Sequence, residues 1–397
     1  MRSQHKSALA LAALALLVPA LALTSGSASA ATRQSGRTVL LPQIVQNGGT
    51  VAAADAAKLA GSVRFKPVRK GRPVVIQRRI GTGAWQKVTT KRENGAGVVS
   101  FTGAAKKNGK FYTYRGVAAR WNGLTSVAAS AQNAGIWKPK FTDEFKGTAL
   151  SSKWSYRQLD QYNPNSDRAC SKSTEDAVKV GNGRVALYVK PDGTRDQTAG
   201  PCVARGADGT LYSNTHWYKN GHISTEKYAY GAFKYGVAAA RVKFDRPQGA
   251  HGSFWLQSTQ PEVSGQGPSL DGAEIDAVEY FGKSYKEGDI YQFIHYRDGA
   301  DKYHKVPNGT PITAARKALA QDDDWFKRYH VFSVEWTPSA YTFRVDGIQT
   351  LRVTQGISKQ KEFLVLSMLS SGWELEKMDR GTLPNSTQVD WARVWQK

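Results

Sequence analysis

Three carboxylates in one short segment are the residues of this chain best suited to chemistry. Glu274, Asp276 and Glu279 lie within the otherwise apolar, β-prone stretch 271–282. Side chains alternate between the two faces of a strand, so Glu274 and Asp276 share a face, and one extra residue at 277–278, a β-bulge, returns Glu279 to it. Carboxyl groups crowded on one face repel one another, which raises the pKa of at least one. Retaining glycosidases cleave a glycosidic bond with two carboxyl groups about 5–5.5 Å apart.

The spacing Glu274-x-Asp276-x-x-Glu279 resembles the bulged active-site signature of glycoside hydrolase family 16, which includes laminarinases, agarases and carrageenases. The resemblance implies that Glu274 is the nucleophile, that Glu279 is the general acid/base, and that Asp276 assists both electrostatically. Glu279 would protonate the leaving oxygen and later deprotonate the incoming water.

Five further segments resemble strands of the same family, in the same order along the chain: Phe141–Gly147, Tyr230–Phe244, Gly252–Leu256, Tyr329–Gly347 and Val389–Trp395. The resemblance covers residues 136–397 and implies an all-β fold, a concanavalin-like β-jelly-roll sandwich whose concave face forms an open cleft. An open cleft suits an endo-acting enzyme, because a polymer can lie along it. The residue pattern agrees, since Thr313–Ala320 is the one short helical stretch after Phe141.

Aromatic side chains are expected in the cleft, because the flat C–H faces of sugar rings pack on them. Trp255 precedes the catalytic strand, and the resemblance implies that it stacks on a sugar near the cleaved bond. His295, on the following strand, resembles the family's cleft histidine, and Trp373 resembles a tryptophan at the cleft edge. An ordinary place in the core or at the rim is the alternative for all three.

Many members of the family carry a structural calcium ion on the convex side of the sandwich. Asp390 matches the family's side-chain ligand, and backbone oxygens near 144–147 would complete an oxygen site, which suits a hard cation. The resemblance therefore implies one structural calcium ion, with a plain surface aspartate as the alternative. We expect no cofactor for catalysis.

The first residues have the parts of a secretory signal peptide. A basic start precedes the apolar run 8–23, and Ala28-Ser-Ala30 forms a small-x-small cleavage site. Residues 1–30 are therefore predicted to be a signal peptide, and the mature protein is predicted to be secreted and extracellular or cell-wall associated, without a membrane anchor. An uncleaved anchor is the alternative, although the run is short for a membrane span and contains Pro19.

Charge divides the remaining chain. Residues 31–135 contain 18 Lys and Arg but 2 Asp and Glu, whereas residues 136–397 contain 35 and 30. Short runs rich in Val, Ile, Tyr and Phe alternate with turn signals in 31–135, which predicts a small β-sandwich. These runs resemble immunoglobulin-like modules of secreted bacterial proteins, for which about 100 residues is the usual size. Residues 126–140, with several Ala, Asn and Gly, are predicted to be a linker.

The strongly basic module 31–135 has two main interpretations. It binds an anionic cell-wall polymer or a similar acidic surface, or it is a soluble spacer whose charge prevents aggregation. No nucleic-acid-binding motif accompanies the charge, so nucleic acid is not the expected partner. The expected partner of residues 136–397 is a polysaccharide substrate, and we expect a monomer.

The chain has two cysteines, Cys170 and Cys202. An even count in a secreted protein suggests one disulfide, which would close a loop over the region 160–209. Two free buried thiols are the alternative. No cluster of Cys and His has the spacing of a zinc site.

Two departures from the laminarinase pattern concern the substrate. The family's Asn-rich strand near the end of the domain is replaced by Leu364–Gly372, and the loop 257–271 matches no family segment. The bulged signature argues against lichenase-type and xyloglucan-type enzymes. A β-1,3-glucan is the single best prediction for the substrate. The alternatives are an endo-galactanase or agarase-like hydrolase, a transglycosylase, and a non-catalytic protein that binds carbohydrate or cell wall.

Overall fold

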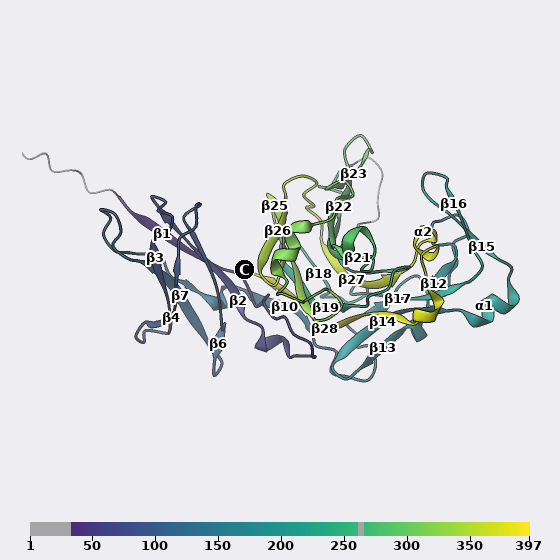
Figure 1. Ribbon diagram of the computed structural model, residues 1–397, viewed down its shortest axis with the longest axis horizontal. Coiled ribbons are helices and arrows are strands. Elements are labelled where there is room, and N and C mark those ends of the chain that lie inside the picture. Colours follow the sequence, from purple (N-terminus) through teal and green to yellow (C-terminus); the bar gives the residue numbers. More distant parts are fainter. Residues whose placement is uncertain (1–32, 261–265) are drawn as a thin grey trace, which may run out of the picture. The chain divides into compact units, whose positions relative to one another are not determined.

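The computed structural model describes residues 33–260 and 266–397, and most of their regular structure is β-strand (Figure 1). Their α-helices are short, α1 over Gly193–Thr198 and α2 over Gly372–Leu375, and the predicted helical stretch is a 3-10 helix over Thr313–Ala318. The all-β prediction is confirmed. None of the described helices is long and apolar enough to cross a membrane. The predicted signal peptide, residues 1–30, lies outside the described residues.

A small β-sandwich forms the first part of the described chain. One of its sheets has the strand order β1–β2–β5, and the other has the order β4–β3–β7–β6, with β8 and β9 also paired to β7. The bounds are β1 Ser35–Leu40, β2 Leu59–Lys66, β3 Pro73–Ile80, β4 Gln86–Arg92, β5 Val98–Gly103, β6 Lys106–Lys107, β7 Lys110–Ala118, β8 Val127–Ala128 and β9 Gln132–Asn133. Buried apolar side chains from both sheets, such as Phe65, Ile76 and Tyr114, pack into one core. The immunoglobulin-like assignment stays a prediction.

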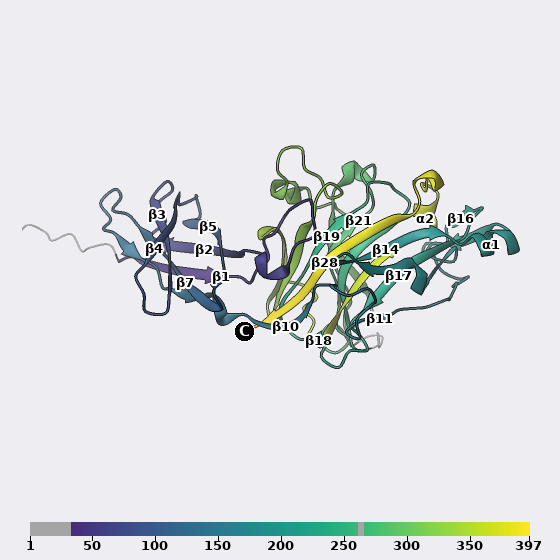
Figure 2. The same ribbon diagram turned by 90° about the horizontal axis from the view of Figure 1, so that it is seen from below.

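The rest of the chain contains two large sheets. The outer sheet has the order β13–β14–β28–β19–β24–β25–β26, with β10 also paired to β28. Figure 2 shows β28 passing between β14 and β19. The bounds are β10 Lys138–Asp143, β13 Val178–Gly181, β14 Arg184–Pro191, β19 Gly236–Phe244, β24 His330–Thr337, β25 Ala340–Val345, β26 Ile348–Val353 and β28 Asn385–Gln396.

The second sheet, here called the cleft sheet, carries the candidate site. Its order is β11–β17–β27–β20–β21–β22–β23, with β18 also paired to β27. The bounds are β11 Ser155–Tyr156, β17 Tyr218–Ser224, β18 Ala232–Phe233, β20 His251–Ser258, β21 Glu274–Tyr280, β22 Tyr291–Arg297, β23 Tyr303–Val306 and β27 Glu362–Leu369. The short strands β12 (Ser171–Ser173), β15 (Cys202–Arg205) and β16 (Leu211–Asn214) lie outside this order.

A single apolar core lies between the two sheets. Phe254, Ile275 and Leu366 of the cleft sheet are fully buried, and they belong to one cluster with Phe332 and Val389 of the outer sheet. Strand alternation then sends the neighbouring side chains of β20, β21 and β27 to the opposite face of the cleft sheet. The polar residues of these strands therefore gather on one face, away from the core.

The prediction that residues 126–140 form a linker is wrong, because this segment contains β8, β9, a 3-10 helix over Ala134–Ile136 and the start of β10. The packing of Trp137 fixes this segment against the rest of the chain. Its indole is 5% exposed and donates a hydrogen bond of 2.8 Å to the Leu40 carbonyl. A buried cluster around it contains Ile44 and Trp391, so the chain is packed where composition alone suggested a flexible connection.

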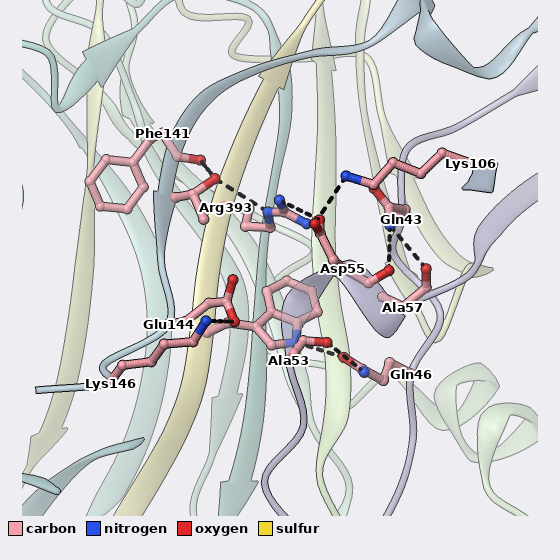
Figure 3. A network of polar contacts seen from close by, with 12 residues as sticks. Gln43, Gln46, Ala53, Asp55, Ala57, Lys106, Phe141, Glu144, Lys146 and Arg393 are labelled. Atoms are coloured by element: carbon pink, nitrogen blue, oxygen red, sulfur yellow. Dashed lines mark hydrogen bonds and ion pairs between the residues drawn. The ribbon is translucent and has the colours of Figure 1, made fainter. Parts of the chain in front are cut away.

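A polar network accompanies this cluster (Figure 3). Asp55 accepts from Lys106 at 3.0 Å and from Arg393 at 3.1 Å. The Gln43 amide donates to the carbonyls of Asp55 and Ala57, at 3.0 and 3.2 Å. The Asp55 contacts join the long segment between β1 and β2 to strands β6 and β28, and the Gln43 contacts hold that segment together.

Candidate active site

Strand β21 has the predicted bulge. Its register against β22 pairs Asp276 with Phe293 and Glu279 with Tyr291, so β21 has one residue more than its neighbour between these pairs. The register against β20 shifts at the same place. Ile275 and Val278 are fully buried in the core. The bulge therefore puts the three carboxylates on the opposite, polar face of the sheet, as the sequence predicted.

All three carboxylates line one cavity of about 220 Å³, here called the central cavity. Its other lining residues include His222 from β17, His251, Ser253 and Trp255 from β20, and Arg168 from the loop before β12. Five strands or loops thus contribute to a space that no single segment of the sequence encodes.

The pKa values of Glu274 and Asp276 are raised well above their ordinary values. Burial, and then the neighbouring charge of Asp276, raise the pKa of Glu274 to about 8. Burial and the charge of Glu279 raise the pKa of Asp276 well above its usual value. The neighbouring carboxylates thus raise both pKa values in the expected direction, although burial is the larger cause, and a proton is retained within the group near neutral pH.

A histidine stands beside each end of the acidic group. His295 Nε2 lies 3.1 Å from Asp276 Oδ2 and 3.9 Å from Glu274 Oε1, and its Nδ1 contacts the Tyr303 hydroxyl. His251 Nε2 lies 4.0 Å from Glu279 Oε1. Each histidine can exchange a proton or share a positive charge with the carboxylate next to it.

His251 is held by a buried carboxylate. Its Nδ1 lies 2.9 Å from both oxygens of Glu374, whose side chain also accepts from the Ser371 backbone N–H at 2.7 Å in a capping box of α2. Burial alone would lower the pKa of His251, but the carboxylate of Glu374, helped by Glu279, raises it. The helix cap thus fixes the imidazole that faces Glu279.

Trp255 forms one wall of the central cavity. Its indole N–H donates to Ser367 Oγ at 3.1 Å, and its ring is stacked on His222 with centroids 6.1 Å apart. The Arg157 guanidinium lies 5.6 Å from the ring centroid and donates to Gln257 at 2.7 Å. The tryptophan is therefore held at the carboxylates by contacts on its edge and face.

Further cavities extend the central one in two directions. A cavity of about 300 Å³ shares Arg157, Gln257 and Glu274 with it and contains His295. Another, of about 210 Å³, shares Gln158, Arg168 and Leu369. The three form a groove in which the carboxylates occupy the middle, and a chain of sugars can extend on both sides of them.

Trp373 does not line any of these three cavities. It lies in α2 and packs against Phe281 and Tyr285, with ring centroids 5.7 and 5.6 Å away. The structure therefore brings Trp255 and His295 to the carboxylates, and places Trp373 in an aromatic cluster behind Glu374.

One carboxylate oxygen of Asp390 is already paired with an arginine. The Asp390 side chain is fully buried and forms an ion pair with Arg241, whose guanidinium also donates to the carbonyls of Gln46, Gly48 and Thr50 at 2.7, 3.3 and 3.1 Å. Oxygen atoms that suit a hard cation thus surround an arginine instead. The other carboxylate oxygen, Asp390 Oδ1, is buried and has no hydrogen bond among the described residues, so the calcium role of Asp390 stays a prediction.

Cys170 and Cys202 form the predicted disulfide, with their Cα atoms 5.5 Å apart. It ties β15 to the loop that carries Arg168, one of the residues shared by two cavities. The bridge therefore fixes part of the groove wall.

Sequence reasoning missed His222, His251, Ser253 and Glu374. His251 and Ser253 lie four and two positions before Trp255, so strand alternation would have put all three on one face. Glu374 directly follows Trp373, which the sequence had already indicated as a candidate. His222 comes from a strand that no motif marked, and only the sheet order brings it to the cavity.

The chain matches one protein family and is similar to several solved structures. Residues 166–393 match the model described as glycosyl hydrolases family 16. The chain is similar to LamAcat from Zobellia galactanivorans, with 19% identity and a TM-score of 0.50 over 66% of this chain and 99% of that one. It is also similar to an endo-β-1,3-glucanase from Pyrococcus furiosus (18% identity, TM-score 0.46, 66% and 94% covered) and to a kappa-carrageenase from Zobellia galactanivorans (19%, 0.48, 66% and 95%). Comparison with curated proteins gives no match.

Proposed function

Because the match covers more than half of the chain, the protein belongs to glycoside hydrolase family 16 and is a glycoside hydrolase, and we propose that it is a secreted, endo-acting, retaining enzyme that cleaves internal β-glycosidic bonds of a polysaccharide. The observation that carries this proposal is the bulged strand β21. It places Glu274, Asp276 and Glu279 in the middle of a groove that continues on both sides.

The proposed reaction is a double displacement. Glu274 attacks the anomeric carbon, so the bond from this carbon to Glu274 forms while the glycosidic C–O bond breaks. Glu279 gives its proton to the leaving oxygen. In the second step Glu279 takes a proton from water, and the resulting hydroxide oxygen replaces Glu274 at the anomeric carbon. When Glu274 is ionised, the proton retained within the group lies on Asp276 beside His295, which reduces the repulsion that Glu274 meets.

The proposed substrate is a β-1,3-glucan. Support comes from the bulged signature and from the position of Trp255 at the wall of the central cavity, where its ring would stack on a sugar. Galactans and agar-like polymers are the competing substrates, since the loop 257–271 and the strand around Leu364 differ from the laminarinase pattern. Transglycosylation would use the same covalent intermediate, with a sugar hydroxyl in place of water.

We further propose that the protein is exported and that the basic sandwich attaches it to an anionic cell-wall polymer. The motivation is the signal-like residues 1–30 and the excess of Lys and Arg in 31–135. The expected result is that the intact protein binds anionic cell-wall material at low salt and is released at high salt, because such binding is screened. Binding that is insensitive to salt would contradict attachment through charge.

The test of the catalytic proposal is release of reducing ends from laminarin, mixed-linkage glucan, agarose, carrageenan and galactans. The wild type is compared with Glu274→Ala and Glu279→Ala, and Glu335→Gln on the outer sheet serves as a control. We expect the two active-site variants to lose nearly all activity on the polymer that the wild type cleaves, and to remain folded. Activity like the wild type in either variant would exclude the assigned roles. A folded wild type that binds a polymer of the panel without cleaving it would instead support a binding protein.

A further inference from the structure

His222 is a buried polar residue with no partner in the described part of the protein. It is 3% exposed, and neither ring nitrogen forms a hydrogen bond with the described residues. Leaving a buried hydrogen-bonding group without a partner destabilises the folded state, so such groups are rare in folded proteins and call for an explanation. Since the ring lines the central cavity, a ligand in that cavity can supply the missing partner.

The neighbours of His222 are already committed to other contacts. Trp255 is stacked beside the imidazole, with ring centroids 6.1 Å apart, and donates its indole N–H to Ser367. Arg157 directs its guanidinium to Gln257 and Glu226, at 2.7 and 3.5 Å. The packing therefore holds the ring in place and leaves its nitrogens available to the cavity.

Ser253 repeats the pattern on the same face. It is 2% exposed, and its hydroxyl has no hydrogen bond among the described residues. In the sheet register, His222 lies opposite Ser367, Ser367 opposite Ser253, and Ser253 opposite Glu279. These four residues form a row across strands β17, β27, β20 and β21. With strands about 4.8 Å apart, the row extends from the acid/base over about 14 Å of the groove floor.

The imidazole of His222 is held neutral. Burial, and then the positive charges of Arg157 and Arg168, keep the pKa of His222 well below its ordinary value. A neutral imidazole has one N–H donor and one acceptor nitrogen. A hydroxyl group can both donate and accept a hydrogen bond, so a neutral sugar hydroxyl matches this site, whereas a cationic group would meet repulsion from the two arginines.

We propose that His222 and Ser253 form a hydroxyl-recognition subsite, which hydrogen-bonds the hydroxyl groups of the sugar unit held on Trp255. The proposal rests on the glycosidase function proposed above and adds the residues that select and align the sugar. His222 is a substrate-binding residue in this scheme, and its unpartnered nitrogens weaken the folded state until the sugar arrives.

The experiment compares His222→Leu and His222→Asn in the full chain. Binding of laminaritetraose is measured by calorimetry in a Glu274→Gln background, and KM and kcat on laminarin are measured without that change. We expect His222→Leu to raise Kd and KM at least fivefold while the melting temperature stays the same or rises, because a buried unpartnered group has been removed. His222→Asn keeps a donor and an acceptor and should retain more affinity than His222→Leu.

His304→Leu is the matched control. His304 is also stacked on an aromatic ring, Tyr296, at 4.7 Å, but it is paired with Asp298 at 2.7 Å and lines none of the three cavities. This variant should lower the melting temperature and leave Kd unchanged. A purely structural His222 would show the same behaviour as this control, and that result would overturn the subsite.

The two proposals fail separately. A wild type that neither cleaves laminarin nor binds laminaritetraose would contradict the proposed substrate, and the variants would then be compared on whichever polymer of the panel is cleaved. Cleavage by the wild type together with an unchanged Kd in His222→Leu would overturn the hydroxyl subsite alone.

Discussion

The crowding of carboxylates at β21 predicts that a catalytic residue weakens the fold. Glu274 has a pKa of about 8 in the folded protein, against an ordinary value near 4.5. Between these values the folded state holds a proton that the unfolded chain releases, so the wild type loses stability as the pH rises through this window. Glu274→Gln has no charge to bury and should not show this loss.

The magnitude follows from the size of the shift. A pH of 7 lies 2.5 units above the ordinary pKa of 4.5, and this difference corresponds to about 3.4 kcal/mol of lost stability at 1.36 kcal/mol per unit. Because the Glu274 side chain is 37% exposed, solvent screens part of this cost, and we expect about 1 kcal/mol in practice. This corresponds to a rise of about 2 °C in melting temperature for a protein of this size.

Urea and thermal unfolding of the wild type and Glu274→Gln at pH 4, 6 and 8 measure the effect. The excess stability of the variant should be near zero at pH 4 and largest at pH 8. Glu335→Gln is the matched control. Glu335 accepts a hydrogen bond from Arg344 at 2.9 Å, so this variant should be less stable than the wild type. An excess that is absent at pH 8, or equal at pH 4 and pH 8, would refute the reasoning from carboxylate repulsion.

Three further outcomes follow from other contacts. Glu374→Gln should destabilise the protein by about 2 kcal/mol in urea unfolding, because both carboxylate oxygens are hydrogen-bonded. The pKa of His251 is raised in the folded protein, so its ion pair with Glu374 stabilises fully below pH 6.5 and less as the pH rises further. The difference in unfolding free energy between the wild type and Glu374→Gln should therefore shrink above pH 6.5. Asp390→Asn should cost about 3 kcal/mol in unfolding free energy by leaving the buried Arg241 charge uncompensated. A fall in the melting temperature of the wild type with EDTA would support the predicted calcium ion, and no change would count against it. Reduction of the Cys170–Cys202 bridge should lower unfolding free energy by about 3 kcal/mol, and no change would show that the loop needs no tether.

Local patterns were enough to predict much of the fold. Alternating apolar residues and frequent turn signals indicated strands throughout, and the odd spacing between Glu274 and Glu279 predicted the bulge that the register of β21 shows. These features depend on residues close together in the chain, where strand geometry leaves few choices.

The linker prediction failed because it concerned contacts between distant segments. The composition of 126–140 suggested a linker, but the partners of Trp137 come from residues near 40 and 391. The ion pair of Asp390 with Arg241 could not be predicted either, because the two residues are distant in the chain and meet across paired strands. A residue pattern shows which groups are polar, whereas only packing shows which charge neutralises them.

The sequence by itself determined the reactive strand, since the types and spacing of three carboxylates are local properties of β21. The tertiary structure alone decided their surroundings. His222 and Ser253 line the central cavity from β17 and β20, and Glu374 of α2 acts on it through its contact with His251. These elements are far apart in sequence but adjacent through sheet order and helix packing. Hydrogen bonding and burial depend on distance in space, so the groups that set the charge and align the sugar became visible only in the folded chain.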